Sequence, residues 1–236
     1  CVSLEDKTVP ETEVVAIKTA VGIDVGLEKF LTTSNGQMVP IQRHYRQAQS
    51  QLARQQKQLS RKEKGSLNWQ RQAVKVGCLQ LHVARQRQAF HYLVAHLLVE
   101  QYDLLVVEEL NIRGLARTPL GQAILDAGWG QFLDILKAVA VKRGKQVLKV
   151  DPRGSSQTCC VCGERVPKTL AERVHNCPRC GSWDRDLNSA LEILKRGLRA
   201  VGQPLSGCGG SWVTSPLKQQ LREVILGSSC LQPVRA

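Results

Sequence analysis

Residues 155–194 read SSQTCCVCGERVPKTLAERVHNCPRCGSWDRDLNSALEIL and contain two Cys-x-x-Cys pairs, with fourteen residues between the inner cysteines. The four cysteines are Cys159, Cys162, Cys177 and Cys180. Each pair forms a tight turn that presents two sulfurs to one ion, so four thiolates at this spacing are typical of a tetrahedral zinc site. Two disulfides or four unrelated core thiols are the alternative, but nothing in the sequence suggests export, and thiols stay reduced inside cells. Residues 155–183 are therefore predicted to form a zinc ribbon.

A helical pattern follows the ribbon. Asp184 and Asp186 lead into NSALEILKRGL, in which Ala190, Leu191 and Leu194 fall on one side of a helix. An acidic residue at a helix start ordinarily caps the helix or interacts with its dipole. Asp186 therefore gains a chemical role only if other carboxylates reach it.

The composition favours a nucleic acid as the large partner. The 236 residues carry a net charge of +13, with a pI near 9.6, and an anionic membrane surface is the second choice. Aromatic residues make up 4% of the chain, which argues against a platform for base stacking. No apolar run approaches the roughly 18 residues that span a bilayer, and no signal peptide is recognised. We expect a cytoplasmic, bacterial-type intracellular protein.

Three short β-like runs follow a polar segment at 1–12, and they cover 14–25, 28–33 and 37–39. Asn35 and Gly36 provide a hairpin signal between the last two runs. Asp24 interrupts the first run, VGIDVG, and a carboxylate buried there without a partner would cost several kcal/mol. Asp24 therefore either lies beside a metal or a partner, or faces water from an edge strand.

Residues 41–102 are predicted to form a long helical hairpin, because apolar residues recur at helical spacing in two stripes. The break between the helices contains Gly65, which is predicted to end the first helix. Ser66 or Asn68 is predicted to cap the second helix.

The hairpin carries most of the positive charge. Residues 41–100 contain eleven Lys or Arg but only two acids, Glu63 and Glu100. This segment therefore contributes +9 to the total charge of +13. A run of charged residues is often only the solvent-exposed face of a helix. Here, however, few acidic residues are available to pair with the cations along the helix, and this favours contact with phosphates. The predicted nucleic-acid-binding residues are Arg43, Arg46, Arg54, Lys57, Arg61, Lys62, Lys64, Arg71, Lys75, Arg85 and Arg87. Arg87 falls on the apolar stripe, so it either snorkels to water or binds a phosphate.

Two further strands and a helix follow the hairpin. The apolar run 104–107 is predicted to be a central strand, and it ends in Glu108 and Glu109. A polar loop then leads to a helix predicted over 128–143, and a strand is predicted over 146–150. The tail, 200–236, is rich in Gly, Ser and Pro and is expected to be flexible, with a helical pattern at 217–225.

Placing the first strand beside the strand that ends at Glu108 gives an α/β fold with a ribonuclease H-like mixed sheet. Asp24 and Glu108 then lie on adjacent parallel strands, and Asp186 approaches from the final helix. Three converging carboxylates repel one another and need cations, and their hard oxygens favour Mg²⁺ or Mn²⁺. Two such ions about 4 Å apart support metal-dependent hydrolysis of a nucleic-acid backbone.

Several motifs carry a resemblance to a known family: GIDVG, VVEELNIRGL, SSQTC-x-x-CG with CPRCG, and DRDLNSA. In this order they resemble the TnpB/OrfB family of bacterial insertion-sequence proteins, long labelled transposases and similar to type V CRISPR effector nucleases. The resemblance runs from about residue 14 to residue 198. It implies a RuvC-like nuclease domain over 13–154 and 184–199, with the zinc ribbon inserted between these two parts.

The resemblance also implies an RNA-guided DNA endonuclease, with DNA and a guide RNA as partners. Matched by position, the three catalytic acids are Asp24, Glu108 and Asp186, whereas the neighbouring Glu109 and Asp184 are rejected.

The chain departs from the family pattern at its start. Full-length members have an N-terminal region that binds the guide RNA, whereas this chain opens with Cys1, close to where that region ends. We therefore expect an N-terminally truncated member, with 1–12 as a residual segment. The alternative to an endonuclease is a non-catalytic DNA- or RNA-binding protein derived from a decayed element. A DNA-joining transposase has the same carboxylates, but the resemblance points away from it.

Overall fold

The computed structural model describes residues 17–169 and 172–202. The predictions for residues 1–12, for nearly all of the tail and for the helical pattern at 217–225 lie outside the described residues. Within the described ranges, no helix combines the length and the apolar character needed to cross a membrane.

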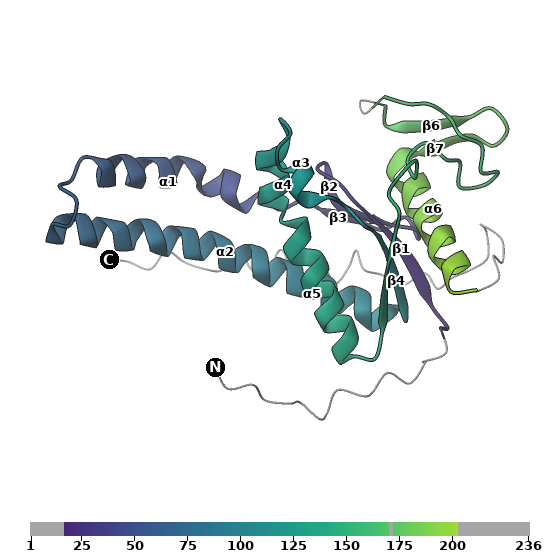
Figure 1. Cartoon of the computed structure of the whole chain (residues 1–236), viewed down its shortest axis with the longest axis horizontal. Coiled ribbons are helices and arrows are strands. Elements are labelled where there is room, and N and C mark those ends of the chain that lie inside the picture. The colour runs from purple at the N-terminus through teal and green to yellow at the C-terminus, as the bar shows by residue number, and fades with distance from the viewer. Residues whose placement is uncertain (1–16, 170–171, 203–236) are drawn as a thin grey trace.

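A five-stranded mixed sheet forms the centre of the fold, with the strand order β3-β2-β1-β4-β5 (Figure 1). The strands are β1 (Ala20–Val25), β2 (Lys29–Thr33), β3 (Met38–Pro40), β4 (Leu104–Glu108) and β5 (Gln146–Val150). The first three pair antiparallel, whereas β1, β4 and β5 run parallel, with Ile23 opposite Val107. The expected pairing of the first strand with the strand that ends at Glu108 is confirmed.

The remaining elements are helices and one small hairpin. The helices are α1 (His44–Ser60), α2 (Leu67–Gln101), α3 (Ile112–Leu115), α4 (Gly121–Ala127), α5 (Trp129–Lys142) and α6 (Arg185–Ala200). The second sheet pairs β6 (Val174–Cys177) with β7 (Gly181–Asp184). The two short helices α3 and α4 occupy a region expected to be a polar loop. Asn111 starts α3, because its side chain accepts a hydrogen bond from the backbone N–H of Gly114 at 3.0 Å.

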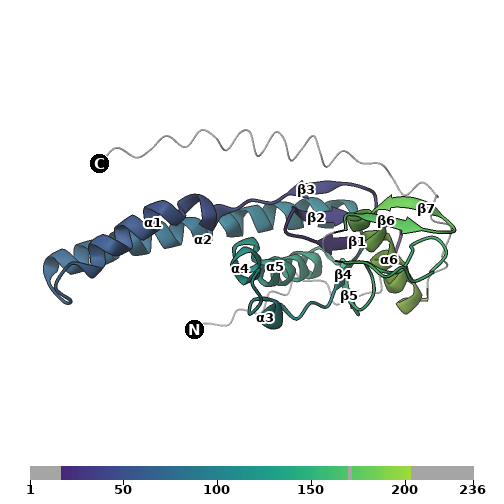
Figure 2. The same ribbon diagram turned by 90° about the horizontal axis from the view of Figure 1, so that it is seen from above.

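The predicted helical hairpin is present, and Figure 2 shows α1 and α2 side by side, projecting beyond the sheet. Ser66 caps α2 as expected, since its hydroxyl accepts a hydrogen bond from the N–H of Trp69 at 3.1 Å. The prediction that Gly65 ends the first helix is wrong, because α1 ends at Ser60. The positive φ of Gly65 (91°) instead serves the turn that leads into Ser66.

Helices cover both faces of the sheet. Side chains of β4 alternate between the faces: Leu105 and Val107 join a large core with α2 and α5, whereas Leu104 and Val106 pack with Ile193 of α6. This continuous apolar run, buried on both faces, is what the sequence of a central strand predicts.

The contact between α6 and β1 is unusually close. A Cβ atom at Gly22 would lie 2.1 Å from the carbonyl oxygen of Ala190 and 2.7 Å from the backbone nitrogen of Leu194. Only a residue without a side chain lets the helix backbone approach the strand at this point.

The substitution Gly22→Ala should therefore lower the free energy of unfolding by roughly 1–3 kcal/mol, because α6 must move away from the sheet. The matched control is Gly77→Ala on the exposed part of α2, where an added Cβ has no neighbour within 4 Å among the described residues. There alanine should stabilise the helix by up to about 1 kcal/mol. Circular dichroism during heating measures both. A Gly22→Ala protein as stable as the unsubstituted chain would contradict the described packing.

Candidate carboxylate site and cysteine cluster

The three carboxylates singled out from the sequence lie on three neighbouring elements. Asp24 is in β1, Glu108 is the last residue of β4, and Asp186 is in the first turn of α6. Because Ile23 pairs with Val107 in parallel register, Asp24 and Glu108 follow at the same level of the sheet. The close packing of α6 on β1 brings the third carboxylate toward the same place.

Asp24 interacts electrostatically with both of the other carboxylates. Burial raises the pKa of Asp24 well above its usual range, and the negative charges of Glu108 and Asp186 raise it further, while Arg185 opposes them. The raised pKa of Asp24 therefore reflects both its burial and its repulsion by two neighbouring carboxylates.

Glu108 is held from the side by a serine. Its Oε1 atom accepts a hydrogen bond from the hydroxyl of Ser155, which is buried. Burial raises the pKa of Glu108, and the hydrogen bond from Ser155 and the charge of Arg196 oppose this rise. The neighbouring Glu109 is exposed to solvent.

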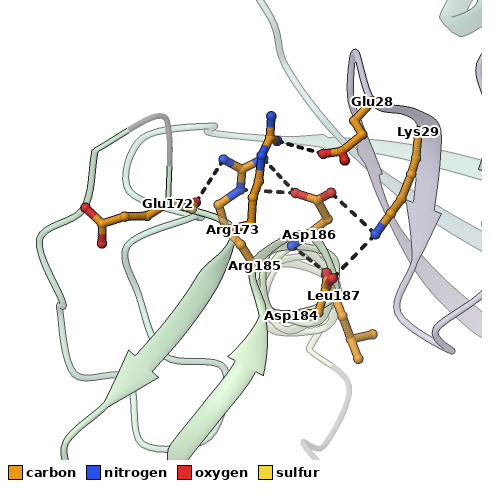
Figure 3. A network of polar contacts seen from close by, with 8 residues as sticks. All are labelled: Glu28, Lys29, Glu172, Arg173, Asp184, Arg185, Asp186 and Leu187. Atoms are coloured by element: carbon orange, nitrogen blue, oxygen red, sulfur yellow. Dashed lines mark hydrogen bonds and ion pairs between the residues drawn. The ribbon is translucent and has the colours of Figure 1, made fainter.

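Asp186 lies between two cations, as Figure 3 shows. The guanidinium of Arg185 donates to its Oδ1 atom from Nε (3.1 Å) and Nη2 (2.9 Å), and Nζ of Lys29 lies 3.8 Å from Oδ2. The helix starts earlier than the pattern NSALEILKRGL indicated, so Asp186 is inside α6 rather than before it.

Asp184 has a different task from Asp186. Its Oδ1 atom accepts hydrogen bonds from the backbone N–H groups of Asp186 and Leu187, both at 3.0 Å, so it caps α6 (Figure 3). Although burial opposes the shift, these N–H groups and the charge of Lys29 lower the pKa of Asp184. A capping role is a sufficient structural account of this residue.

The four cysteines form the tightest group of ligand atoms. Their sulfurs all lie within 4.8 Å of one another, and among residues 17–169 and 172–202 no other set of three or more His, Cys, Asp or Glu side chains is so closely gathered. The cluster could bind a metal such as zinc. Gly163 and Gly181 follow the two pairs with positive φ angles of 77° and 83°, as turns under a metal require.

Most of the predicted nucleic-acid-binding residues are exposed along α1, α2 and their connection, with Lys62 and Arg87 half-buried. Arg87 contacts Asp126 of α4, with Nη2 and Oδ1 3.5 Å apart. The buried Asp126 in turn accepts hydrogen bonds from the N–H groups of Tyr45 (2.8 Å) and Arg46 (3.2 Å) at the start of α1. Arg87 thus supports the base of the hairpin, an account that neither snorkelling nor phosphate binding anticipated.

Sequence reasoning missed the residues that hold the carboxylates: Ser155, Lys29 and Arg185. The motifs SSQTC and DRDLNSA contain two of them, but a motif does not say which side chain a hydroxyl or guanidinium reaches. No sequence pattern pointed to Lys29, because β2 meets the start of α6 only in the folded chain.

Replacing Asp24 with asparagine should stabilise the fold in buffer without added divalent cations. The pKa of Asp24 is higher in the folded than in the unfolded chain, so ionisation of this carboxyl opposes folding. The resulting loss of stability develops as the pH rises from the pKa of the unfolded chain through that of the folded chain. Asp24→Asn should therefore raise the Tm at neutral pH, and the difference should vanish below a pH of about 3.9.

Asp184→Asn is the matched control for this measurement. The pKa of Asp184 is lowered, so its charge supports folding, and its loss should lower the Tm at neutral pH. A lower Tm for Asp24→Asn as well would contradict the described repulsion.

Two family models match the chain. The OrfB_IS605 model, described as a probable transposase, matches residues 1–118, and the TNB-domain model of Cas12f1-like proteins matches residues 129–193. The second match includes the four cysteines and Asp186.

Curated relatives and a solved structure show the same similarity. "Putative RNA-guided DNA endonuclease InsQ" of Escherichia coli is 30% identical over 243 residues, covering 95% of this chain and 59% of the relative. "Putative RNA-guided DNA endonuclease" of Streptomyces pristinaespiralis is 33% identical over 198 residues, covering 82% of this chain and 48% of the relative. The chain thus spans about half the length of these relatives.

In the cryo-EM structure of the Cas12f1-sgRNA-target DNA complex, the similar chain superposes with a TM-score of 0.55 at 17% identity. The match covers 79% of this chain and 52% of that chain, and it indicates a similar fold. Because the transposase family model matches half of the chain, and the relatives share its sequence over most of its length, this chain belongs to the TnpB/OrfB family.

Proposed function

We propose that this chain is the nuclease part of a transposon-encoded, RNA-guided DNA endonuclease, in which Asp24, Glu108 and Asp186 support metal-dependent hydrolysis of phosphodiester bonds. The observation that carries the proposal is the convergence of these acids from β1, β4 and α6, with a raised pKa at Asp24 caused in part by the other two. The names of the two bacterial relatives support the choice of reaction.

The domain organisation is proposed with it. The sheet order, in which three antiparallel strands are followed by two parallel ones, is consistent with a ribonuclease H-like, RuvC-like domain over 13–154 and 184–199. The cysteine segment 155–183 would be a ribbon inserted into it.

The donor set fits hard divalent cations. Carboxylate oxygens are the ligands that Mg²⁺ and Mn²⁺ prefer, and Asp24, Glu108 and Asp186 would supply them here. Two such ions bound by three carboxylates are the arrangement that supports in-line cleavage of a phosphodiester bond. When bound, such ions would supply an activated water and would neutralise charge on the leaving oxygen.

The chain's own residues would prepare this chemistry. Asp24, Glu108 and Asp186 would hold the ions, while Ser155 keeps Glu108 in place and Lys29 and Arg185 balance the charge of Asp186. The exposed cations of the hairpin would bind the phosphates of DNA or of a guide RNA, because they meet few acids of their own.

We also propose a structural zinc ion on the four cysteines. Replacing Cys159 and Cys177 with serine should release the zinc and unfold the ribbon locally, because a structural site contributes folding energy. Elemental analysis of the purified chain should find one zinc per chain before the substitutions and none after them. Replacing the exposed Cys78 with serine is the control and should leave the zinc content unchanged. Zinc retained in the double variant would refute this site.

The central test is Mg²⁺-dependent cleavage of single-stranded DNA by the purified chain. Asp24→Asn or Asp186→Asn should lower the rate by about 10³-fold or more, because the bound ions contribute several kcal/mol to the transition state. Glu109→Gln, at the exposed neighbour of Glu108, is the matched control and should cleave normally.

Binding, measured by fluorescence anisotropy at rising salt, should stay largely intact in all three variants. Cleavage by Asp24→Asn at the unsubstituted rate would contradict the proposal. An absence of cleavage from every protein, with binding that weakens steeply as salt rises, would instead favour the non-catalytic nucleic-acid binder.

A further inference from the structure

The hydroxyl of Ser155 is the side-chain hydrogen-bond donor on Glu108, and it comes from the segment that opens the cysteine ribbon. Ser155 lies four residues before Cys159 and is 5% exposed. Its hydroxyl reaches the Oε1 atom of Glu108 across a sequence separation of 47 residues. A carboxylate of the proposed nuclease site is therefore held by the ribbon segment rather than by its own strand.

Several local hydrogen bonds define the turn around Ser155. Gly154 has a φ of 74°, and its carbonyl oxygen accepts hydrogen bonds from the N–H and from the hydroxyl of Thr158, both at 2.9 Å. The N–H of Gln157 donates to the same oxygen at 3.0 Å. The position of Ser155 is consequently set by the turn 154–158 as a unit.

Asn188 of α6 holds the other end of this turn. It is fully buried, and its Oδ1 atom accepts a hydrogen bond from the N–H of Cys160 at 2.9 Å. Its Nδ2 atom donates to the carbonyl oxygen of Thr158 at 2.8 Å. Both bonds would be lost if the amide were reversed, so the side chain has one orientation.

Asn188 stands two residues after Asp186 on the same helix. The path from α6 through Asn188, Thr158 and Ser155 to Glu108 is therefore continuous, and it joins the elements that carry two of the three acids. Such a link is useful because like charges push the acids apart, and because a ligand carboxylate with a free rotamer binds a cation less well than a fixed one.

We propose that Ser155 is a positioning residue for Glu108, and that Asn188 fixes the turn carrying Ser155 against the helix that carries Asp186. This inference rests on the proposed function, since it assumes that the three carboxylates bind divalent cations. It assigns to the start of the ribbon a role in the geometry of the carboxylate site, in addition to holding its own metal.

The test is Mn²⁺ binding by isothermal titration calorimetry on purified, zinc-loaded chains of all 236 residues, with zinc content and Tm recorded for each. Ser155→Ala should bind Mn²⁺ about 10–100-fold more weakly, the usual effect of losing a hydrogen-bond partner of a metal ligand. Ser155→Thr keeps the hydroxyl and should recover most of the affinity. Ser156→Ala, at the exposed neighbouring serine, is the matched control and should bind normally.

Asn188→Asp is the second variant, because it keeps the size of the side chain and loses the donor to Thr158. This substitution should also weaken Mn²⁺ binding at an unchanged zinc content, although the side chain of residue 188 bonds to the turn and not to Glu108 or Asp186. Asp24→Asn should lose the binding altogether.

Three results would overturn the inference. Normal Mn²⁺ affinity in Ser155→Ala, with binding lost in Asp24→Asn, would refute the positioning role and leave the carboxylate site standing. Weak binding in Ser155→Ala accompanied by loss of zinc would mean that the serine merely stabilises the ribbon. Normal binding in Asp24→Asn would place the Mn²⁺ elsewhere, and would refute the proposed metal site together with this inference.

Discussion

The close approach of α6 to β1 is the constraint on which the rest of the structure depends. Gly22 lets the backbone of α6, at Ala190 and Leu194, lie directly against the strand. This contact fixes the height of α6 over the sheet, and with it the place of the first helical turn, where Asp186 stands. Gly197 repeats the arrangement further along the helix, where a Cβ would lie 2.3 Å from a methyl carbon of Val106. The two glycines thus allow α6 to pack closely against the parallel strands β1 and β4.

The acids brought together in this way are kept in place by neighbours of complementary character. Burial and mutual repulsion act against the ionised form of Asp24, while Arg185 and Lys29 accompany Asp186, and a neutral hydroxyl accompanies Glu108. The three acids therefore have three different local environments, although they lie in one region. Their differences come from the elements that meet here: β2 supplies the lysine, the start of α6 the arginine, and the turn before the cysteines the serine.

Much of this arrangement could be predicted from residue patterns. The apolar run at 104–107 and its acidic end predicted a central strand and a candidate ligand, and the two Cys-x-x-Cys pairs predicted a cluster that the structure brings together. The end of α1, the two short helices after β4 and the start of α6 were not predicted. Local caps set two of these boundaries: Asn111 starts α3, and Asp184 caps α6. Periodicity carries no information about such partners.

The 35-residue helix α2 belongs to two regions at once. Its last third, from Phe90 onward, is part of the main core with α5, while its earlier turns pack with α1 and carry exposed cations. The helix is continuous, so ordering its outer turns and folding the core are thermodynamically linked. A polyanion that binds the helical hairpin as proposed, present at a concentration about 100 times its Kd, would stabilise the folded chain by about 2.7 kcal/mol, provided that it does not bind the unfolded chain. Such a ligand would therefore also favour folding of the core to which α2 belongs.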